Sequence, residues 1–168
     1  MPPQALPEIV IVSGARTPMA EWIGGKRGDG LPGGALAPVS AIDLGAAAAK
    51  GAIERAGIPA SQIDHVVMGN ALQTSADAIY GARHVGLKAG VPIETPALTV
   101  NRLCGSGLQS VATAASFIQL GEATWVLAGG MENMSQAPHV LRGARSGFRL
   151  GATPALEDSL FVALKDSF

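Results

Sequence analysis

The sequence predicts an α/β protein with a mostly parallel β-sheet and helices on both of its faces. Short apolar segments rich in Val and Ile alternate along the chain with longer segments of helical periodicity. Such alternation is typical of right-handed βαβ units. Ala and Gly are also abundant, with 29 and 22 of the 168 residues, whereas aromatic residues make up only 4%. A core with so many small side chains predicts helices and strands that pack at short distances.

The predicted strands and helices follow one another in alternating order. The first helix is predicted to begin at Ser40, with Asp43 three residues on as a capping-box partner, and to end at Gly57. The Gly- and Pro-rich segment 24–38 is predicted to be an exposed loop. The predicted strands are 8–13, 64–69, 97–102 and 123–128, and the predicted helices are 40–57, 78–90 and 105–121; no clear strand is predicted after Gly130.

The predicted helix 105–121 lacks the charged face of an ordinary surface helix. No charged residue lies between Arg102 and Glu122, and a helix without charge all round is usually covered all round. A unit of four strands can cover only one face of it, so we expect a second domain or a partner subunit to cover the rest. Its apolar stripe at helical spacing consists of Leu108, Val111, Ala112, Ala115 and Ile118.

Charge and composition exclude several classes of protein. Twelve basic and 13 acidic residues give a net charge of −1, which argues against nucleic acid or an anionic membrane as a partner. Hydrophobic residues at 48% exclude intrinsic disorder. A single cysteine cannot form an internal disulfide, and neither a secretory signal nor a membrane-spanning stretch is recognisable. We therefore expect a cytoplasmic protein.

Cys104 is the first candidate for a reactive group. It lies between a predicted strand and a predicted helix, beside Gly105 and Gly107. Unpaired N–H groups and the dipole at a helix N-terminus stabilise a thiolate and can hold an oxyanion, and the glycines leave room for a substrate. The alternative is that Cys104 is a small buried hydrophobic residue. The surrounding glycines match neither the serine-hydrolase nor the dinucleotide-binding pattern.

The histidines and arginines give weaker signals. His65 and His84 are expected to be structural or solvated, whereas His139 lies in a loop region from which it could approach Cys104. No pair of histidines has metal-ligand spacing, so no metal is predicted. A small basic group consists of Arg142, Arg145 and Arg149. It could attract a polyanionic ligand, but a solvated face or a subunit contact is the favoured interpretation.

Two long motifs resemble those of a known family. Residues 100–110 (VNRLCGSGLQS) resemble the acyl-enzyme signature of the thiolases, and residues 129–138 (GGMENMSQAP) resemble the second thiolase signature. Residues 15–18, 64–69 and 156–160 also follow the family's order. The resemblance covers nearly the whole chain except 24–38, and it identifies the chain as the N-terminal, nucleophile-bearing half of a thiolase.

The resemblance implies an acyl-CoA C-acyltransferase of the acetyl-CoA acetyltransferase or 3-ketoacyl-CoA thiolase type. Cys104 would be the catalytic nucleophile that forms an acyl-enzyme, and Leu164 would correspond to a leucine of the acyl pocket. Coenzyme A thioesters would be substrates, with no separate cofactor. The implied fold is half of a five-layered αβαβα arrangement, and the full-length parent would be a homodimer or a homotetramer.

The resemblance also divides the chain and shows departures from the family. Residues 1–138 would form the N-terminal thiolase domain without its last strand, and 139–168 the truncated start of a loop insertion that contacts CoA. The family's second cysteine and catalytic histidines have no counterpart here, and His139 matches none of them. The 168-residue chain alone is therefore expected to be inactive.

Three alternatives remain open. One is a decarboxylating ketosynthase that uses acyl carrier protein, although both motifs speak against it. The others are a non-catalytic interaction module and one half of a split thiolase.

Overall fold

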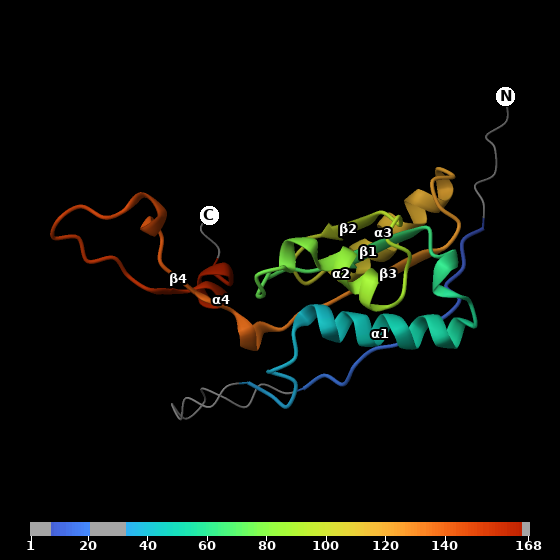
Figure 1. Ribbon diagram of the computed structural model, residues 1–168, viewed down its shortest axis with the longest axis horizontal. Helices are drawn as coiled ribbons and strands as arrows, with labels where there is room; N and C mark the ends of the chain where they lie inside the picture. The colour runs from blue at the N-terminus through green and yellow to red at the C-terminus, as the bar shows by residue number, and fades with distance from the viewer. Residues whose placement is uncertain (1–7, 21–32, 166–168) are drawn as a thin grey trace.

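A three-stranded parallel sheet forms the centre of the molecule (Figure 1). The computed structural model describes residues 8–20 and 33–165. Strand β1 (His65–Gly69) lies in the middle, between β2 (Ala97–Val100) and β3 (Val126–Gly130). Both neighbours run parallel to β1, and their register places Gly69 opposite Val100 and Gly130. The predicted parallel α/β sheet is thus confirmed for these three strands.

Three helices alternate with these strands along the chain, in the predicted order: α1 (Ala41–Ala56), α2 (Gly81–Lys88) and α3 (Ser106–Gln119). The predicted caps of α1 are confirmed, because the Ser40 hydroxyl accepts a hydrogen bond from the N–H of Asp43 and Gly57 has a left-handed φ of 69°. α2 is shorter than predicted, because Ala78–Tyr80 forms a separate 3₁₀ turn. The other 3₁₀ turns are Ala60–Gln62, Met134–Gln136 and Ala144–Ser146.

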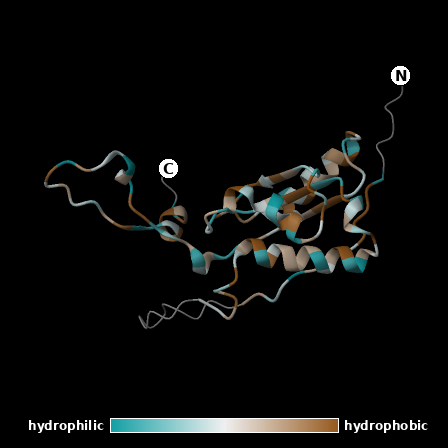
Figure 2. Cartoon of the chain, in the orientation of Figure 1, coloured by the Kyte–Doolittle hydropathy of each residue, from teal (hydrophilic) through white to brown (hydrophobic). Residues whose placement is uncertain are grey.

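Helices cover both faces of the sheet, as predicted. On one face, Val66 and Met68 belong to the core that α1 and α2 close. On the other face, a Cβ atom at Gly69 would touch the backbone of Ser106 in α3. Alternation along β1 therefore sends successive side chains to opposite helical layers. Figure 2 shows mainly hydrophobic residues on the strands, while hydrophobic and hydrophilic residues alternate along α1.

The predicted first strand, 8–13, is wrong. The segment is extended, but it pairs with no strand of the sheet, and Val10, Ile11 and Val12 are 65%, 81% and 53% exposed. It runs alongside α1, where the Arg55 guanidinium donates to the carbonyl oxygen of Gly14 (2.9 Å) (Figure 1). An apolar pattern shows only that a segment suits a sheet, and it does not determine which contact the segment makes in the fold. The segment instead borders a cavity of about 490 Å³ between α1, α3 and β3.

The buried face of α3 is not the predicted apolar stripe. Ser106, Ser110 and Ala114 are the buried residues of this helix, whereas Leu108 is 77% exposed. The Ser110 hydroxyl lies within hydrogen-bond distance of the carbonyl oxygens of Gly107 (2.6 Å) and Gly129 (2.7 Å). Small residues face the sheet because the helix approaches it closely, so the larger apolar residues remain outside. The expectation that this chain covers only part of the helix agrees with the structure.

Beyond the sheet, residues 139–165 form an arm that extends away from the helices (Figure 1). Contrary to expectation it contains two strands, β4 (His139–Val140) and β5 (Glu157–Asp158), which pair antiparallel, followed by the short helix α4 (Ser159–Ala163). Strands of two residues are too short to leave a periodic pattern in the sequence. The division into 1–138 and 139–168 stays a prediction.

Of the predicted exposed loop 24–38, residues 33–38 form turns and bends, and 24–32 lie outside the described residues. Within the described ranges, no helix is long and apolar enough to cross a membrane.

Asp64 connects the beginnings of β1 and β3, and its carboxylate gives a testable contribution to stability. The N–H groups of Trp125 (2.9 Å) and Thr124 (2.8 Å) donate to it and hold its pKa below the usual 3.8. Because the folded pKa is lowered, this stabilisation is present above the unfolded pKa and is lost as pH falls through the folded pKa. We expect Asp64→Asn to lower the free energy of unfolding by about 1 kcal/mol at pH 7. The difference from the wild type should narrow below about pH 4.

Urea unfolding at a series of pH values would measure this difference. Glu54→Gln, on the exposed surface of α1, is the control and should have little effect at any of them. A constant difference for Asp64→Asn between pH 7 and pH 2.5 would contradict a role for the carboxylate charge.

Candidate active site around Cys104

Cys104 lies at the carboxyl edge of the parallel sheet. β2 ends four residues before it and α3 begins two residues after it. The cysteine is exposed and free, so the alternative of a small buried hydrophobic residue is wrong. The carboxyl edge of an open parallel sheet is where such folds usually place ligands.

The turn that carries Cys104 is closed by hydrogen bonds on both sides. The N–H of Gly105 donates to the carbonyl oxygen of Arg102 (3.0 Å), and the N–H of Ser106 donates to that of Leu103 (3.0 Å). The Ser106 hydroxyl accepts from the N–H of Arg102 (2.8 Å) and donates to the carbonyl oxygen of Leu103 (2.6 Å). Ser106 is only 4% exposed, so this hydroxyl is a fixed internal brace of the turn.

Glycines at the strand ends allow this turn to come close to the sheet. A Cβ atom at Gly69 would lie 2.5 Å from the carbonyl carbon and 2.6 Å from the oxygen of Ser106. A Cβ atom at Gly130 would lie 3.4 Å from the Cα of Gly107. The first turn of α3 therefore rests on the ends of β1 and β3. This is the short-distance packing that the Ala and Gly content predicts.

The N-terminus of α3 is open beside the cysteine. Gly105 is the N-cap residue and has no side chain to cap the helix, and a Cβ atom at Gly107 would meet nothing within 4 Å. Free N–H groups in a first helical turn carry partial positive charge and can stabilise a thiolate or an oxyanion. The arrangement thus combines a nucleophile type, a source of positive potential and space for a substrate.

The polar residues of the second motif were not predicted from the sequence as parts of the site. The side-chain NH₂ group of Asn133, a 7% exposed residue, donates to the carbonyl oxygen of Val39 (2.6 Å) and thereby attaches the segment before α1 to the end of β3. The Glu132 carboxylate accepts hydrogen bonds from the backbone N–H groups of Ala71 (2.9 Å) and Leu72 (3.1 Å). Polar residues directly after a buried strand were the available signal, but their partners lie about 60 or more residues away.

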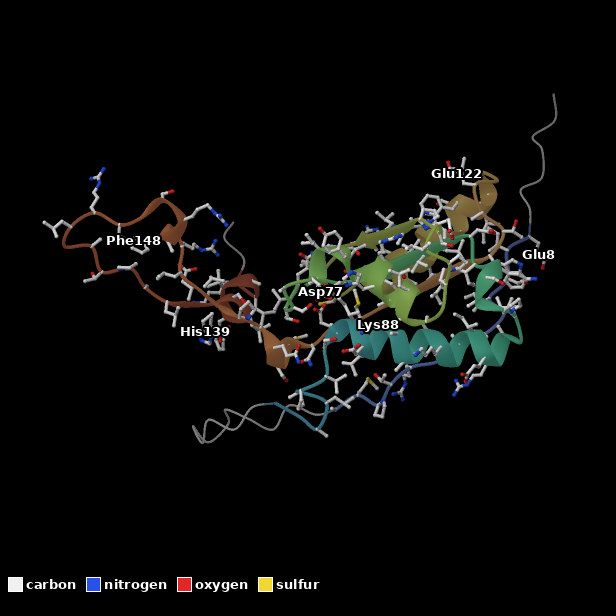
Figure 3. All side chains as sticks on the ribbon, in the orientation of Figure 1. Glu8, Asp77, Lys88, Glu122, His139 and Phe148 are labelled. Atoms are coloured by element: carbon white, nitrogen blue, oxygen red, sulfur yellow. The ribbon has the colours of Figure 1, made fainter. Side chains whose placement is uncertain are left out.

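The three histidines have separate surroundings. The ring of His65 stacks on Phe117, with 4.4 Å between centroids. His84 Nδ1 lies 2.8 Å from Asp77 Oδ2. A hydrogen bond from Ser75 and then that of His84 lower the pKa of Asp77. These placements fit the structural roles expected for His65 and His84. His139 belongs to β4 in the arm and lies outside the three-stranded sheet (Figure 3).

The arm carries the remaining predicted residues. Arg142 Nε donates to Glu157 Oε2 (2.8 Å), so one of the three arginines is paired within the arm, and Arg145 and Arg149 are exposed. Leu164 follows α4 and is 72% exposed. Its role in an acyl pocket stays a prediction. Across residues 8–20 and 33–165, no group of three or more His, Cys, Asp or Glu side chains is placed to hold a metal ion.

Fold and site together define a class: α/β proteins that present an exposed cysteine between a parallel strand and a glycine-rich helix N-terminus. Comparison with known families then places the chain within that class. The family described as thiolase, N-terminal domain, matches residues 9–168. The chain belongs to the thiolase family.

Individual relatives agree with this assignment. The chain is 48% identical to human mitochondrial 3-ketoacyl-CoA thiolase over 158 residues, which are 94% of this chain and 37% of that protein. It is 43% identical to an acetyl-CoA acetyltransferase of Cupriavidus necator over 161 residues, 96% of this chain and 38% of the relative. The chain therefore spans a little over a third of the length of these relatives.

Solved structures show the same similarity in three dimensions. The crystal structure of human mitochondrial 3-ketoacyl-CoA thiolase superimposes with a TM-score of 0.84, covering 92% of this chain and 37% of that one. A further crystal structure of that enzyme is a complex with CoA. The acetyl-CoA acetyltransferase of Bacillus anthracis, 32% identical, gives a TM-score of 0.83 over 97% of this chain and 38% of the other. The predicted thiolase-type fold is confirmed.

The close approach at Gly69 gives a second testable prediction. Gly69→Ala places a methyl group against the Ser106 backbone, which no side-chain rotation can relieve. We expect the free energy of unfolding to fall by about 1–3 kcal/mol. Gly107→Ala is the matched control, because open space surrounds that position and alanine favours a helix by up to about 1 kcal/mol. Thermal and urea unfolding would compare the two variants. Equal stability of the two would contradict the packing described here.

Proposed function

We propose that the protein containing this chain is an acyl-CoA C-acyltransferase in which Cys104 carries the acyl group. The observation that supports this most directly is the exposed thiol directly before the uncapped N-terminus of α3. The names of the relatives, 3-ketoacyl-CoA thiolase and acetyl-CoA acetyltransferase, indicate the substrate class. The reaction is cleavage of a 3-ketoacyl-CoA by CoA, or the reverse condensation of two acyl-CoA molecules.

In the cleavage direction, the Cys104 thiolate attacks the ketone carbonyl of the 3-ketoacyl-CoA. The bond between C2 and C3 then breaks, the electron pair leaves as the enolate of acetyl-CoA, which keeps the CoA of the substrate, and a proton converts that enolate to acetyl-CoA. The acyl group remains on sulfur as a thioester until the thiol of CoA attacks it and regenerates Cys104. N–H groups at the start of α3 are suited to stabilise the negative oxygen during attack.

Other parts of the enzyme complete this chemistry. The group that takes the proton from Cys104, and the acid that protonates the enolate, are assigned to the portion of the relatives' length that this chain does not span. Within the chain, the arm is assigned to the CoA thioester, with Leu164 against the acyl chain. The exposed guanidinium groups of Arg145 and Arg149 are suited to its phosphates. No separate cofactor takes part.

The proposed assembly of the full-length protein is a homodimer or a homotetramer. Large apolar side chains on and directly after α3 are uncovered in this chain, among them Leu108 in the helix and Leu120 at its C-cap, and exposed apolar surface of this kind promotes association. A cytoplasmic location remains the prediction from the sequence, although several relatives are mitochondrial enzymes by name.

A chimeric enzyme would test the proposed function. The chain replaces the matching 161 residues of the Cupriavidus necator acetyltransferase, which supplies the remaining catalytic groups, and thiolysis of acetoacetyl-CoA is measured. We expect turnover in the chimera and a loss of about 10⁴-fold or more in Cys104→Ser. Mass spectrometry after incubation with acetyl-CoA should find one acetyl group on the peptide containing Cys104.

The same assay tests the alternative of a non-catalytic interaction module and the role of Cys104 as nucleophile. A chimera that folds, as judged by circular dichroism and sedimentation, but acylates nothing would favour a non-catalytic interaction module. Activity that survives Cys104→Ser would overturn the proposed mechanism. The 168-residue chain by itself is expected to show little or no turnover, because the residues of such a catalytic unit act together.

A further inference from the structure

We infer that Asn101 is a positioning residue for Cys104, and that Glu132 holds Asn101 in place through the backbone of residues 70–72. This inference rests on the proposed role of Cys104 as nucleophile. It gives a physical function to the second motif, whose acidic residue lies in a different segment of the chain from the cysteine. The connection runs through three hydrogen-bonded steps.

The first step joins Glu132 to the loop after β1. The Glu132 carboxylate accepts from the N–H groups of Ala71 and Leu72 and from the side-chain NH₂ group of Asn70 (3.0 Å). Among the described residues no basic side chain forms an ion pair with it. Its charge is thus compensated by directed N–H groups, two of which belong to the backbone. An acceptor with two oxygens fixes this loop more firmly than a single hydrogen bond would.

The second step joins that loop to Asn101. The side-chain NH₂ group of Asn101 donates to the carbonyl oxygen of Ala71 (2.9 Å). Glu132 and Asn101 therefore hold the same residue, one through its N–H and the other through its carbonyl. Asn101 follows directly after β2, so its backbone is also fixed by the sheet.

The third step joins Asn101 to the residue before the cysteine. The side-chain carbonyl oxygen of Asn101 accepts from the N–H of Leu103 (2.9 Å). Leu103 has a φ of 50°, and it is the one non-glycine residue with positive φ in the described part of the chain. A leucine in this conformation is strained by roughly 1–2 kcal/mol.

The strain at Leu103 is informative because its side chain gains no packing within this chain. That side chain is largely exposed here, so contacts inside the chain do not require the left-handed conformation. What the conformation determines is the direction in which the backbone enters Cys104. Strained residues that persist without a packing benefit are typical of functional turns. Asn101 on one side and the Ser106 hydroxyl on the other hold the peptide groups that keep Leu103 in this conformation.

The chemical consequence concerns the distance between the thiol and the start of α3. If the turn relaxes, Cys104 moves away from the partial positive charge of the first-turn N–H groups, and the sulfur reacts more slowly with an electrophile. A change at Asn101 should therefore alter the reactivity of the thiol even though Asn101 touches no substrate.

Alkylation of the folded chain by iodoacetamide, followed by mass spectrometry between pH 6 and pH 9, would measure this effect. We expect Asn101→Ala to slow alkylation of Cys104 at pH 7 by about two- to fivefold and to move the rate profile to higher pH. In urea, where the turn is absent, variant and wild type should react alike. Gln109→Ala is the matched control, since that amide pairs with the Arg102 side chain (2.6 Å) rather than with the backbone of Leu103.

Two further variants keep the inference testable if Asn101→Ala fails to fold. Asn101→Asp retains the acceptor for Leu103 but places a carboxylate against the carbonyl oxygen of Ala71. Glu132→Gln places an NH₂ group against a backbone N–H. Both should slow alkylation. Leu103→Gly removes the strain, so the effect of Asn101→Ala should shrink in that background, which a double-mutant cycle would quantify.

The outcomes distinguish this inference from the proposed function. Wild-type alkylation rates and pH profiles in folded variants of both Asn101 and Glu132 would overturn the positioning role, whatever the chimera shows. If Cys104→Ser leaves the chimera active, the proposed function fails while slower alkylation still supports the positioning role. In an active chimera, Asn101→Ala should lower kcat several-fold and leave KM unchanged, because the residue acts through Cys104.

Discussion

The first turn of α3 can rest on the sheet only because glycine ends both β1 and β3. With backbone packed against backbone, there is no room for a Cβ atom at Gly69. Much of the architecture depends on this contact. It selects Ser106 and Ser110 as the buried face of the helix, leaves the larger apolar residues outside, and places Cys104 at the carboxyl edge of the sheet. The many small residues of the chain are thus a requirement of the site as well as of the core.

Two carboxylates outside the nucleophile turn fix the backbone at the two edges of the sheet, Asp64 at the edge where β1 and β3 begin and Glu132 at the carboxyl edge that carries the turn. Asp64 and Glu132 each accept hydrogen bonds from backbone N–H groups of another strand or loop. Such bonds specify direction as well as distance, which an exposed ion pair does not. The half-exposed Lys88–Asp43 pair, at 2.9 Å, illustrates the contrast, because pairs of this kind contribute little and weaken with salt. The orientation of the backbone at both edges of the sheet therefore depends little on ionic strength.

The features that could be predicted from the sequence are those with local causes. The caps of α1 depend on Ser40, Asp43 and Gly57, which lie within or beside the helix that they end, and the sequence sufficed to locate them. The position of Cys104 between a strand and a glycine-rich helix start was predicted for the same reason, because it is a local pattern; its role as nucleophile stays a proposal.

The features that were missed depend on contacts between distant segments. Whether 8–13 joins the sheet depends on a partner edge, and which face of α3 is buried depends on the glycines of two strands. The hydrogen bonds between Glu132 and the loop after β1 join residues about 60 positions apart. Neither segment alone contains a pattern that predicts these hydrogen bonds.

The arm has no comparable anchorage. Every residue from 141 to 150 is exposed, and the pairing of β4 with β5 is internal to the arm. Insertions, deletions and sequence changes in this segment would leave the hydrogen bonds around Cys104 untouched, because none of them passes through it. If the arm holds the substrate, as proposed, such changes alter which molecule is bound and leave the turn around Cys104 as it is. Divergence of specificity at constant mechanism is then an evolutionary consequence of how the chain is anchored.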